Sequence, residues 1–490
     1  MSEWTPESHP ENETDINGFN KITSEAKSYT VDDAVNKAGY GKFQIRLLIL
    51  SGIAWIAESV EVFIISVLSQ FLACDWTLTK QQPAILAYAA FIGITVGCAT
   101  LGSLADILGR KKVLAASLIT ILSFGLATAF VPSFLWMAIC RSFVGFGVAG
   151  VTQGLTVCTE YCPIHMRGRN GFFFSYFWTF GTIMAVLLSW VIMVYRNSWR
   201  LLLAILALPP LLVLLCLNWY PESARYYLVS HQYERAVEVL QKVAKTNGTD
   251  LPPGRLVHVF TKEKRGRLKD LLSKEYRVAT LLIWYLGWAS SLIIYGTVFI
   301  TPIIIQSGFL GRAKSDNQTS GNQSETDLDI IPCVEFTQEN FVDLLWMSSA
   351  ELPGLLIFTF IAEKWGRKVT LSVSCFINGV LLPLLLLRTY KSVILLILFA
   401  IRGFMVAIAR LSYIISLEIY PTTFRSVGLA YHLFFSQVAG FVIPYVSQVL
   451  VFDYPEAVMG LLAGSIFLAG IAAAFLPFET KGVKMKEIAK

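Results

Sequence analysis

Six ionisable residues lie inside long apolar stretches of this 490-residue chain, and they are the first candidates for chemistry. They are three acids and three bases, namely Glu58, Glu61, Arg141, Glu351, Arg402 and Arg410. A charge at the centre of a bilayer costs at least about 2.5–3.5 kcal/mol, so such residues are usually paired or functional. The equal numbers of acids and bases allow complete mutual neutralisation, which is the purely structural interpretation.

Glu58 and Glu61 are three positions apart, so they share one face of a helix. Two carboxylates this close in a poorly hydrated cavity repel each other, which favours the uptake of a proton by one of them. We therefore expect at least one of them to bind substrate or a coupling proton. The structural alternatives are a salt bridge to Arg141 and a position of Glu58 near the outer water.

Arg410 follows Arg402 by eight positions in one apolar stretch. Its guanidinium stays charged and offers a planar fork that fits a carboxylate. We expect Arg410 to contact an anionic substrate, with pairing to Glu351 or Glu61 as the alternative, and Arg402 to be structural. The aromatic candidates for lining a substrate cavity are Trp178, Trp288, Trp346 and Tyr413, beside Trp55, Tyr176, Trp284 and Tyr295. Aromatic rings in membrane helices are also ordinary lipid-facing residues.

The elements that position these residues are predicted to be membrane helices. Hydrophobic residues make up 55% of the chain and charged residues 15%, which excludes a soluble globular protein of this length. We predict an all-α membrane protein with twelve transmembrane helices. Their ranges are 45–72, 84–105, 113–131, 135–158, 171–194, 199–219, 278–305, 342–362, 369–388, 393–417, 426–451 and 456–477. The sequence has no phosphate-binding glycine loop, zinc spacing or catalytic constellation, so we expect neither a cofactor, a metal nor an enzyme.

Basic residues set the expected orientation. With both termini on the cytoplasmic side, the inside segments carry 30 of the 40 Lys and Arg residues, as the positive-inside rule requires. The expected domains are a tail (1–43) with a short helix, an N-terminal bundle (44–219), a linker with amphipathic helices (220–277), a C-terminal bundle (278–477) and a tail (478–490). We expect the linker helices to pack under the bundle, with binding to anionic lipid as the alternative.

A large outer loop is predicted at 306–341, inside the C-terminal bundle. It carries two sequons for glycosylation, at Asn317 and Asn322. Cys74 and Cys333 both fall in outer loops, so they are candidates for a disulfide, with two free thiols as the alternative.

The two predicted bundles share sequence motifs. Asp106-Ile-Leu-Gly109-Arg110-Lys111 is echoed by Glu363-Lys-Trp-Gly366-Arg367-Lys368, 257 positions later. Glu160-Tyr-Cys-Pro163 with Arg167 is echoed by Glu418-Ile-Tyr-Pro421 with Arg425, 258 positions later, and Arg141-Ser-Phe by Arg402-Gly-Phe at 261. Three pairs at nearly one offset indicate two related six-helix halves. In such architectures the transport site lies between the halves near mid-membrane.

These motifs resemble those of the major facilitator superfamily. The loop motif runs from Gly102 to Lys112 and the fourth-helix motif from Arg141 to Gly150, and Pro221-Glu-Ser-Ala-Arg225 and Pro477-Phe-Glu-Thr-Lys-Gly482 resemble motifs after helices six and twelve. Val31-Asp-Asp-Ala-Val, Cys74-Asp-Trp and Glu418-Ile-Tyr-Pro-Thr-Thr-Phe-Arg are similar to the synaptic-vesicle-two-related branch. Arg410 departs from that branch, which has an uncharged residue there.

The resemblance implies two pseudo-symmetric six-helix bundles of the major facilitator fold and a secondary transporter of small organic ions. It also implies a gating role at the cytoplasmic boundary for Asp106, Gly109, Arg110, Lys111, Glu160, Arg167 and their second-half counterparts Glu363, Arg367, Glu418 and Arg425. Because of Arg410 we favour an organic anion such as an aromatic carboxylate, with nicotinate as an example, and protons as the coupling ion. The rivals are an organic cation transporter and a non-transporting vesicle receptor or scaffold. We expect a monomer in contact with membrane lipid and not with nucleic acid, in a secretory or synaptic vesicle or the plasma membrane.

Overall fold

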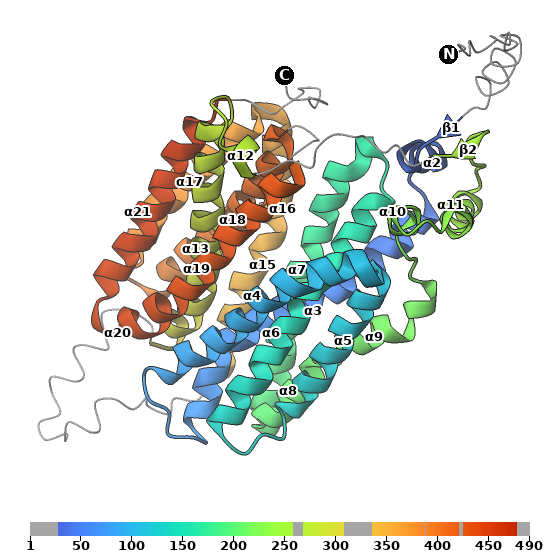
Figure 1. The fold of residues 1–490 in the computed structure, drawn as a ribbon. Helices are drawn as coiled ribbons and strands as arrows, with labels where there is room; N and C mark the ends of the chain where they lie inside the picture. Colours follow the sequence, from blue (N-terminus) through green and yellow to red (C-terminus); the bar gives the residue numbers. More distant parts are fainter. Residues whose placement is uncertain (1–27, 258–267, 308–335, 388, 421–424, 478–490) are drawn as a thin grey trace, which may run out of the picture.

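The computed structural model describes residues 28–257, 268–307, 336–387, 389–420 and 425–477. Two groups of long helices lie side by side, one from each half of the chain (Figure 1). The first group is α3 (Lys42–Ala73), α4 (Gln82–Leu108), α5 (Arg110–Ala127), α6 (Phe134–Glu160), α7 (Arg167–Arg196), α8 (Trp199–Leu206) and α9 (Pro209–Leu215). The second group is α13 (Arg277–Ser307), α15 (Gln338–Ser349), α16 (Glu351–Trp365), α17 (Arg367–Leu384), α18 (Lys391–Ile419), α19 (Arg425–Tyr445), the π-helix η4 (Val446–Leu450), α20 (Val451–Asp453) and α21 (Pro455–Ala474).

The arrangement confirms an all-helical membrane protein. Within the described ranges, nine segments are long and apolar enough to cross a membrane. Each of the twelve predicted spans is helical in the structure. The three that do not meet the same criterion are α5 and α17, which begin with basic residues, and the short apolar segment Trp199–Leu215.

Two spans that were predicted as continuous helices are interrupted, and in both a proline accounts for the break. Pro209 and Pro210 separate α8 from α9, because a proline lacks an amide hydrogen and its ring clashes with the carbonyl of the preceding turn. Pro353 cannot donate a hydrogen bond to the carbonyl of Ser349, and the helix breaks between them at Ala350. The second break places Glu351 in the first turn of α16, where the helix dipole favours a negative charge.

The repeat in the sequence is visible in the backbone. Gly109 joins α4 to α5 with φ 103° and ψ 147°, and Gly366 joins α16 to α17 with φ 98° and ψ 160°. Residues other than glycine rarely adopt such positive φ values, so each sharp turn depends on its glycine. The two halves therefore contain the same turn at equivalent positions.

Short elements gather at one end of the molecule, which we call the terminal side; the opposite end is the far side (Figure 1). They are β1 (Ser28–Tyr29), α2 (Val31–Ala38), the 3₁₀ turns η1 (Ile164–Met166) and η2 (Leu217–Trp219), α10 (Ala224–Val229), α11 (Tyr233–Asn247), β2 (Arg255–Leu256) and α12 (Leu268–Leu271). β1 and β2 pair in parallel, with Ser28 opposite Arg255. Thr30 caps α2 in a capping box with Asp33.

The linker helix α11 packs onto the protein through one apolar face. Its buried face consists of Ala236, Leu240, Val243 and Ala244. At its end the Asn247 carboxamide accepts a hydrogen bond from the amide of Phe43 (3.1 Å) and donates one to Gln44 (2.8 Å). These contacts attach α11 to the start of α3, so this part of the linker belongs to the N-terminal half.

Candidate functional site

Glu61 and Arg141 form a buried ion pair inside the N-terminal half. Arg141 on α6 donates to Glu61 Oε2 on α3 at 2.5 Å, and the two side chains are only 4% and 5% exposed. A second guanidinium nitrogen of Arg141 donates to Thr128 Oγ1 (3.4 Å). The structural alternative for Glu61, a salt bridge to Arg141, is the arrangement observed here.

Glu351 and Arg402 form the corresponding pair in the C-terminal half. Glu351 is fully buried and accepts a hydrogen bond from Arg402 on α18 at 3.2 Å. Its other carboxylate oxygen accepts from Thr179 Oγ1 on α7 at 3.0 Å. Glu351 therefore neutralises Arg402 and also connects the two halves at mid-depth, a link through Thr179 that the sequence did not reveal.

Glu58 and Arg410 are the acid and base that remain. They come from opposite halves, α3 and α18, and interact electrostatically. Their charged atoms are not within the 4.0 Å of an ion pair, although both side chains are partly buried. Glu58 and Glu61 thus share a helix but interact with different bases. Glu61 pairs with Arg141, and Glu58 interacts with Arg410.

Three further side chains face this couple. Tyr413 interacts with Arg410 from one turn further along α18. Tyr295 on α13 and Cys98 on α4 both interact with Glu58. Tyr295 was a sequence candidate for cavity lining, whereas Cys98 reaches Glu58 only because α4 approaches α3.

Several buried polar atoms have no hydrogen-bond partner among the described residues. They include Glu58 Oε2, the indole nitrogens of Trp55 and Trp284, and the Gln437 carboxamide oxygen. Buried polar groups are normally hydrogen-bonded, so unsatisfied ones indicate places that a ligand or water occupies. Trp55 lies three residues before Glu58 on α3 and packs edge-on against Phe174 (5.0 Å), so its indole shares a helix face with the carboxylate.

No ring contact between described residues brings the predicted cavity-lining tryptophans to this couple. Trp346 is 53% exposed and stacks on Phe399 of α18, with ring centroids 4.7 Å apart. Trp288 lies against Tyr285 (5.8 Å), whose hydroxyl donates to the carbonyl of Ser465 on α21. Trp178 is partly buried against the core. Their role in binding stays a prediction.

The loop motif of the N-terminal half forms a connected network at the terminal side. Arg110 forms an ion pair with Glu160, and Ser223 donates to the other oxygen of that carboxylate (2.5 Å). Glu222 accepts from the backbone amides of Arg110 (2.8 Å) and Lys111 (3.1 Å), so its charge lies at the N-terminus of α5. Glu222 therefore occupies a helix N-terminus. Asp106 is exposed and has no hydrogen bond or ion pair to a described residue.

The second half repeats part of this network. Arg367 and Glu418 form an ion pair that corresponds to that of Arg110 and Glu160. Glu363 is exposed, and the side chain of Arg425 lies outside the described residues. Arg167 pairs with Asp32 on α2 (2.6 Å), which also pairs with Arg225 (2.8 Å). The N-terminal helix was not expected to take part in these charge contacts.

Aromatic residues join the halves between mid-depth and the far side. Phe91 on α4 is 1% exposed and packs edge-on against Tyr295 (5.0 Å) and Phe299 (6.4 Å) of α13. A Cβ atom on Gly440 of α19 would lie only 2.6 Å from the same ring. Phe71 at the end of α3 packs against Phe336 (5.6 Å). Between described residues, the ring contacts that join the halves therefore lie away from the terminal side.

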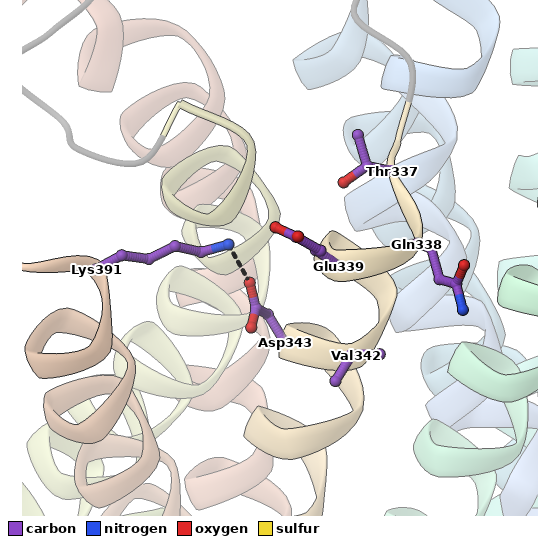
Figure 2. Close-up of a pocket in the computed structure, with 6 residues that line it drawn as sticks. All are labelled: Thr337, Gln338, Glu339, Val342, Asp343 and Lys391. Atoms are coloured by element: carbon purple, nitrogen blue, oxygen red, sulfur yellow. Dashed lines mark ion pairs between the residues drawn. The ribbon is translucent and has the colours of Figure 1, made fainter.

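One surface pocket lies at the far side and is separate from these charges. Figure 2 shows its lining residues at the start of α15 and of α18, with Lys391 directed at Asp343 (2.6 Å). Its volume is about 690 Å³. Asp343 lies about two helical turns before Glu351 along the chain, and no predicted site residue lines the pocket.

Cys74 is disulfide-bonded in the structure. Its expected partner Cys333 and the sequons Asn317 and Asn322 lie outside the described residues, so the Cys74 to Cys333 pairing and the glycosylation stay predictions. The other six cysteines, at 98, 140, 158, 162, 216 and 375, are free.

The model of the sugar (and other) transporter family matches residues 16–300 and 354–490. The chain is 34% identical to the synaptic vesicle 2-related protein of Xenopus laevis over 94% of this chain and 83% of that protein. It is 31% identical to the putative transporter SVOPL of Homo sapiens, over 95% and 94% of the two chains. The inward-open xylose transporter XylE of E. coli has the same fold, with a TM-score of 0.64 at 15% identity over 90% of this chain and 98% of that chain. The chain therefore belongs to the sugar (and other) transporter family of the major facilitator superfamily, among the relatives of the synaptic vesicle 2-related proteins.

Proposed function

We propose that this membrane transporter moves a small organic anion, such as an aromatic carboxylate of the nicotinate type, by alternating access. The observation that carries the proposal is Arg410, a partly buried arginine within α18 that forms no ion pair with a described residue. Membrane-embedded arginines are costly unless a counter-charge is close. A carboxylate is the counter-charge that best fits the two parallel donors of a guanidinium.

Unsatisfied polar atoms and an aromatic surface occur in both halves, as the binding of a planar solute would require. The indole nitrogens of Trp55 and Trp284 are free donors, and the Gln437 oxygen is a free acceptor. The ring of Trp284 stacks on Phe435 (4.8 Å), so an aromatic surface is available on the C-terminal half. A sugar would need more hydrogen-bonding side chains than the apolar helices supply.

The contacts between the halves support alternating access. The aromatic contacts around Phe91 close the far side, whereas the ion pairs of Arg110 and Arg367 each lie within one half. Each half can therefore move as a unit when the contacts between the halves break and reform. By the distribution of basic residues we assign the terminal side to the cytoplasm, so the closed far side faces the vesicle lumen or the cell exterior.

The test is uptake into proteoliposomes of labelled nicotinate, compared with an organic cation and a sugar. We expect uptake of nicotinate alone, a loss of at least tenfold in Arg410→Ala, and unchanged uptake in Arg235→Ala, an exposed arginine on α11. Equal uptake by wild type and Arg410→Ala would refute the anion site. No uptake of any carboxylate in a wider panel would favour the non-transporting vesicle protein.

An organic cation is the second candidate substrate, and Glu58 is the observation in its favour. The carboxylate has one buried oxygen without a partner, which a cationic nitrogen could satisfy. Preferential uptake of the cation, with loss of uptake in Glu58→Gln and not in Arg410→Gln, would establish that alternative. In either case we propose a monomeric, non-enzymatic protein in a vesicle or plasma membrane.

A further inference from the structure

An arginine and a tryptophan meet on the terminal side of the N-terminal half. The guanidinium carbon of Arg46 on α3 lies 6.0 Å from the ring centroid of Trp219, the last residue of the 3₁₀ turn η2. Both side chains are exposed, and Trp219 is 64% accessible. A guanidinium over an indole is attracted by the negative face of the ring. The contact therefore favours one position of Arg46 without using its hydrogen-bond donors.

Those donors are free of the protein. The guanidinium of Arg46 forms no hydrogen bond or ion pair with a described residue. The other cation–π contact between described residues is different. There Arg200 lies over Trp199 (4.5 Å). Its guanidinium also donates to the carbonyls of Ala129 (3.1 Å) and Val131 (3.2 Å). Arg200 thus holds two segments of the far side together, whereas the planar fork of Arg46 is available to a ligand.

Exposed apolar side chains continue from this contact along α3 and α9, which pack against each other. Ile45 and Ile49 on α3 are 49% and 45% exposed. Leu212 and Leu215 on α9 are 57% and 72% exposed. In a bilayer such side chains contact acyl chains, and a tryptophan or an arginine beside them is typical of the headgroup level. The contact of Arg46 therefore lies where an apolar surface meets the aqueous phase.

Two exposed lysines add positive charge beside Arg46. Lys42 lies one turn before it on α3. Lys245 is on α11, two residues before Asn247, whose carboxamide accepts from the amide of Phe43 (3.1 Å) at the start of α3. Neither lysine forms an ion pair with a described residue. We call Lys42, Arg46, Trp219 and Lys245 the Arg46 corner.

We propose that the Arg46 corner binds one anionic phospholipid, whose acyl chains lie on the exposed apolar surface of α3 and α9. The lipid phosphate accepts hydrogen bonds from the fork of Arg46 and from the indole nitrogen of Trp219. Lys42 and Lys245 balance the remaining negative charge of the headgroup. A guanidinium suits this role because it bonds a phosphate through two parallel donors. The orientation assigned above places the corner in the leaflet that contains anionic lipids, and the inference does not depend on which solute is transported.

The experiment titrates the purified full-length protein in detergent with phosphatidylserine and counts bound lipids by native mass spectrometry. Phosphatidylcholine with the same acyl chains is the comparison, because its headgroup has no net charge. We expect one phosphatidylserine to bind with a Kd at least about tenfold lower, since only an anionic headgroup neutralises the basic side chains. Arg46→Gln should raise the Kd for phosphatidylserine about tenfold or more, as the loss of hydrogen bonds to a charged group requires.

The matched control is Arg235→Gln, which removes one charge from the exposed face of α11, about 18 Å before Asn247 along the helix. Its Kd should equal that of the wild type. Arg46→Lys keeps the charge and loses the planar fork, so its Kd should rise severalfold. Trp219→Leu keeps an apolar side chain and loses both the ring and the indole donor, so it should also bind more weakly. Unchanged affinity in Arg46→Lys and Trp219→Leu would overturn the proposed geometry.

Three other results would overturn the inference. Equal affinity for the two lipids would exclude a site for an anionic headgroup. Equal losses in Arg46→Gln and Arg235→Gln would mean that binding follows total charge. Displacement of the lipid by soluble glycerophosphoserine would mean that the corner binds a phosphate ester without acyl chains. If Arg46→Gln fails to fold, Arg46→Lys decides: weaker binding of phosphatidylserine supports the site, and unchanged binding refutes it.

Discussion

Gly440 offers a direct test of how the far side closes. A Cβ atom at this position would lie 2.6–3.2 Å from three atoms of the Phe91 ring on the other half. Phe91 cannot easily move away, because it is almost fully buried and packs against Tyr295 and Phe299. We predict that Gly440→Ala destabilises the state closed at the far side relative to the state open there.

The expected size follows from the cost of overpacking. An additional methyl group in a well-packed interface typically costs about 1–3 kcal/mol. Because the overlap exists only when the two halves meet, the whole cost falls on the conformational equilibrium, which shifts about 5- to 150-fold. The gain in helix propensity from glycine to alanine, about 1 kcal/mol, applies to both conformations and cancels.

The assay is the distance between spin labels on the far side of each half. Phe130, 80% exposed between α5 and α6, and Tyr454, 62% exposed before α21, are suitable positions after replacement of Cys98 and Cys216. Gly440→Ala should raise the population with a longer distance. Gly464→Ala on α21, where a Cβ atom meets nothing within 4 Å, should match the parent protein. Identical distance distributions for the two variants would refute the steric argument.

Three other predictions concern stability and covalent structure. Glu61→Gln leaves Arg141 as an uncompensated buried charge and should lower the free energy of unfolding by about 3–5 kcal/mol, measured as a lower Tm in detergent. Replacing both residues by Leu should recover most of that stability. An unchanged Tm for Glu61→Gln would contradict the buried pair. The hydrogen bond from the Thr30 amide lowers the pKa of Asp33 from 3.8. The cap therefore stabilises docked α2 above pH 3.8, and this stabilisation is lost as the pH falls through the lowered pKa. The measurement is amide hydrogen exchange in α2, which should become faster at acid pH in the wild type and not in Asp33→Asn. A non-reducing peptide map should link Cys74 to Cys333, and two free thiols there would exclude the bond.

The fold was predictable from local patterns. Apolar length marks each membrane span, because a helix is the way for a single segment to satisfy its backbone in lipid. The repeated loop motifs predicted two related halves, and the equivalent glycine turns at Gly109 and Gly366 agree with this. The interruptions at Pro209 and Ala350 were missed, although Pro210 and Pro353 were signals for them in the sequence.

The candidate site was only partly predictable. The sequence identified the six charges, since any ionisable residue in an apolar span stands out. It did not identify which acid meets which base, and the neighbours Glu58 and Glu61 were expected to share one environment. Residues without an unusual type or position, such as Thr179 and Cys98, gave no signal, because their importance comes from which helix approaches them.

The sequence alone therefore determined composition-based properties: the membrane environment, the helical spans, the internal repeat and the short inventory of buried charges. These depend on the free energy of transferring single residues into lipid, which each residue carries wherever it lies. Only the tertiary structure decided that Glu61 and Glu351 form ion pairs with Arg141 and Arg402, while Glu58 and Arg410 form none with a described residue. Pairing depends on distances between helices that are far apart in the chain, and those distances are set by packing between the helices.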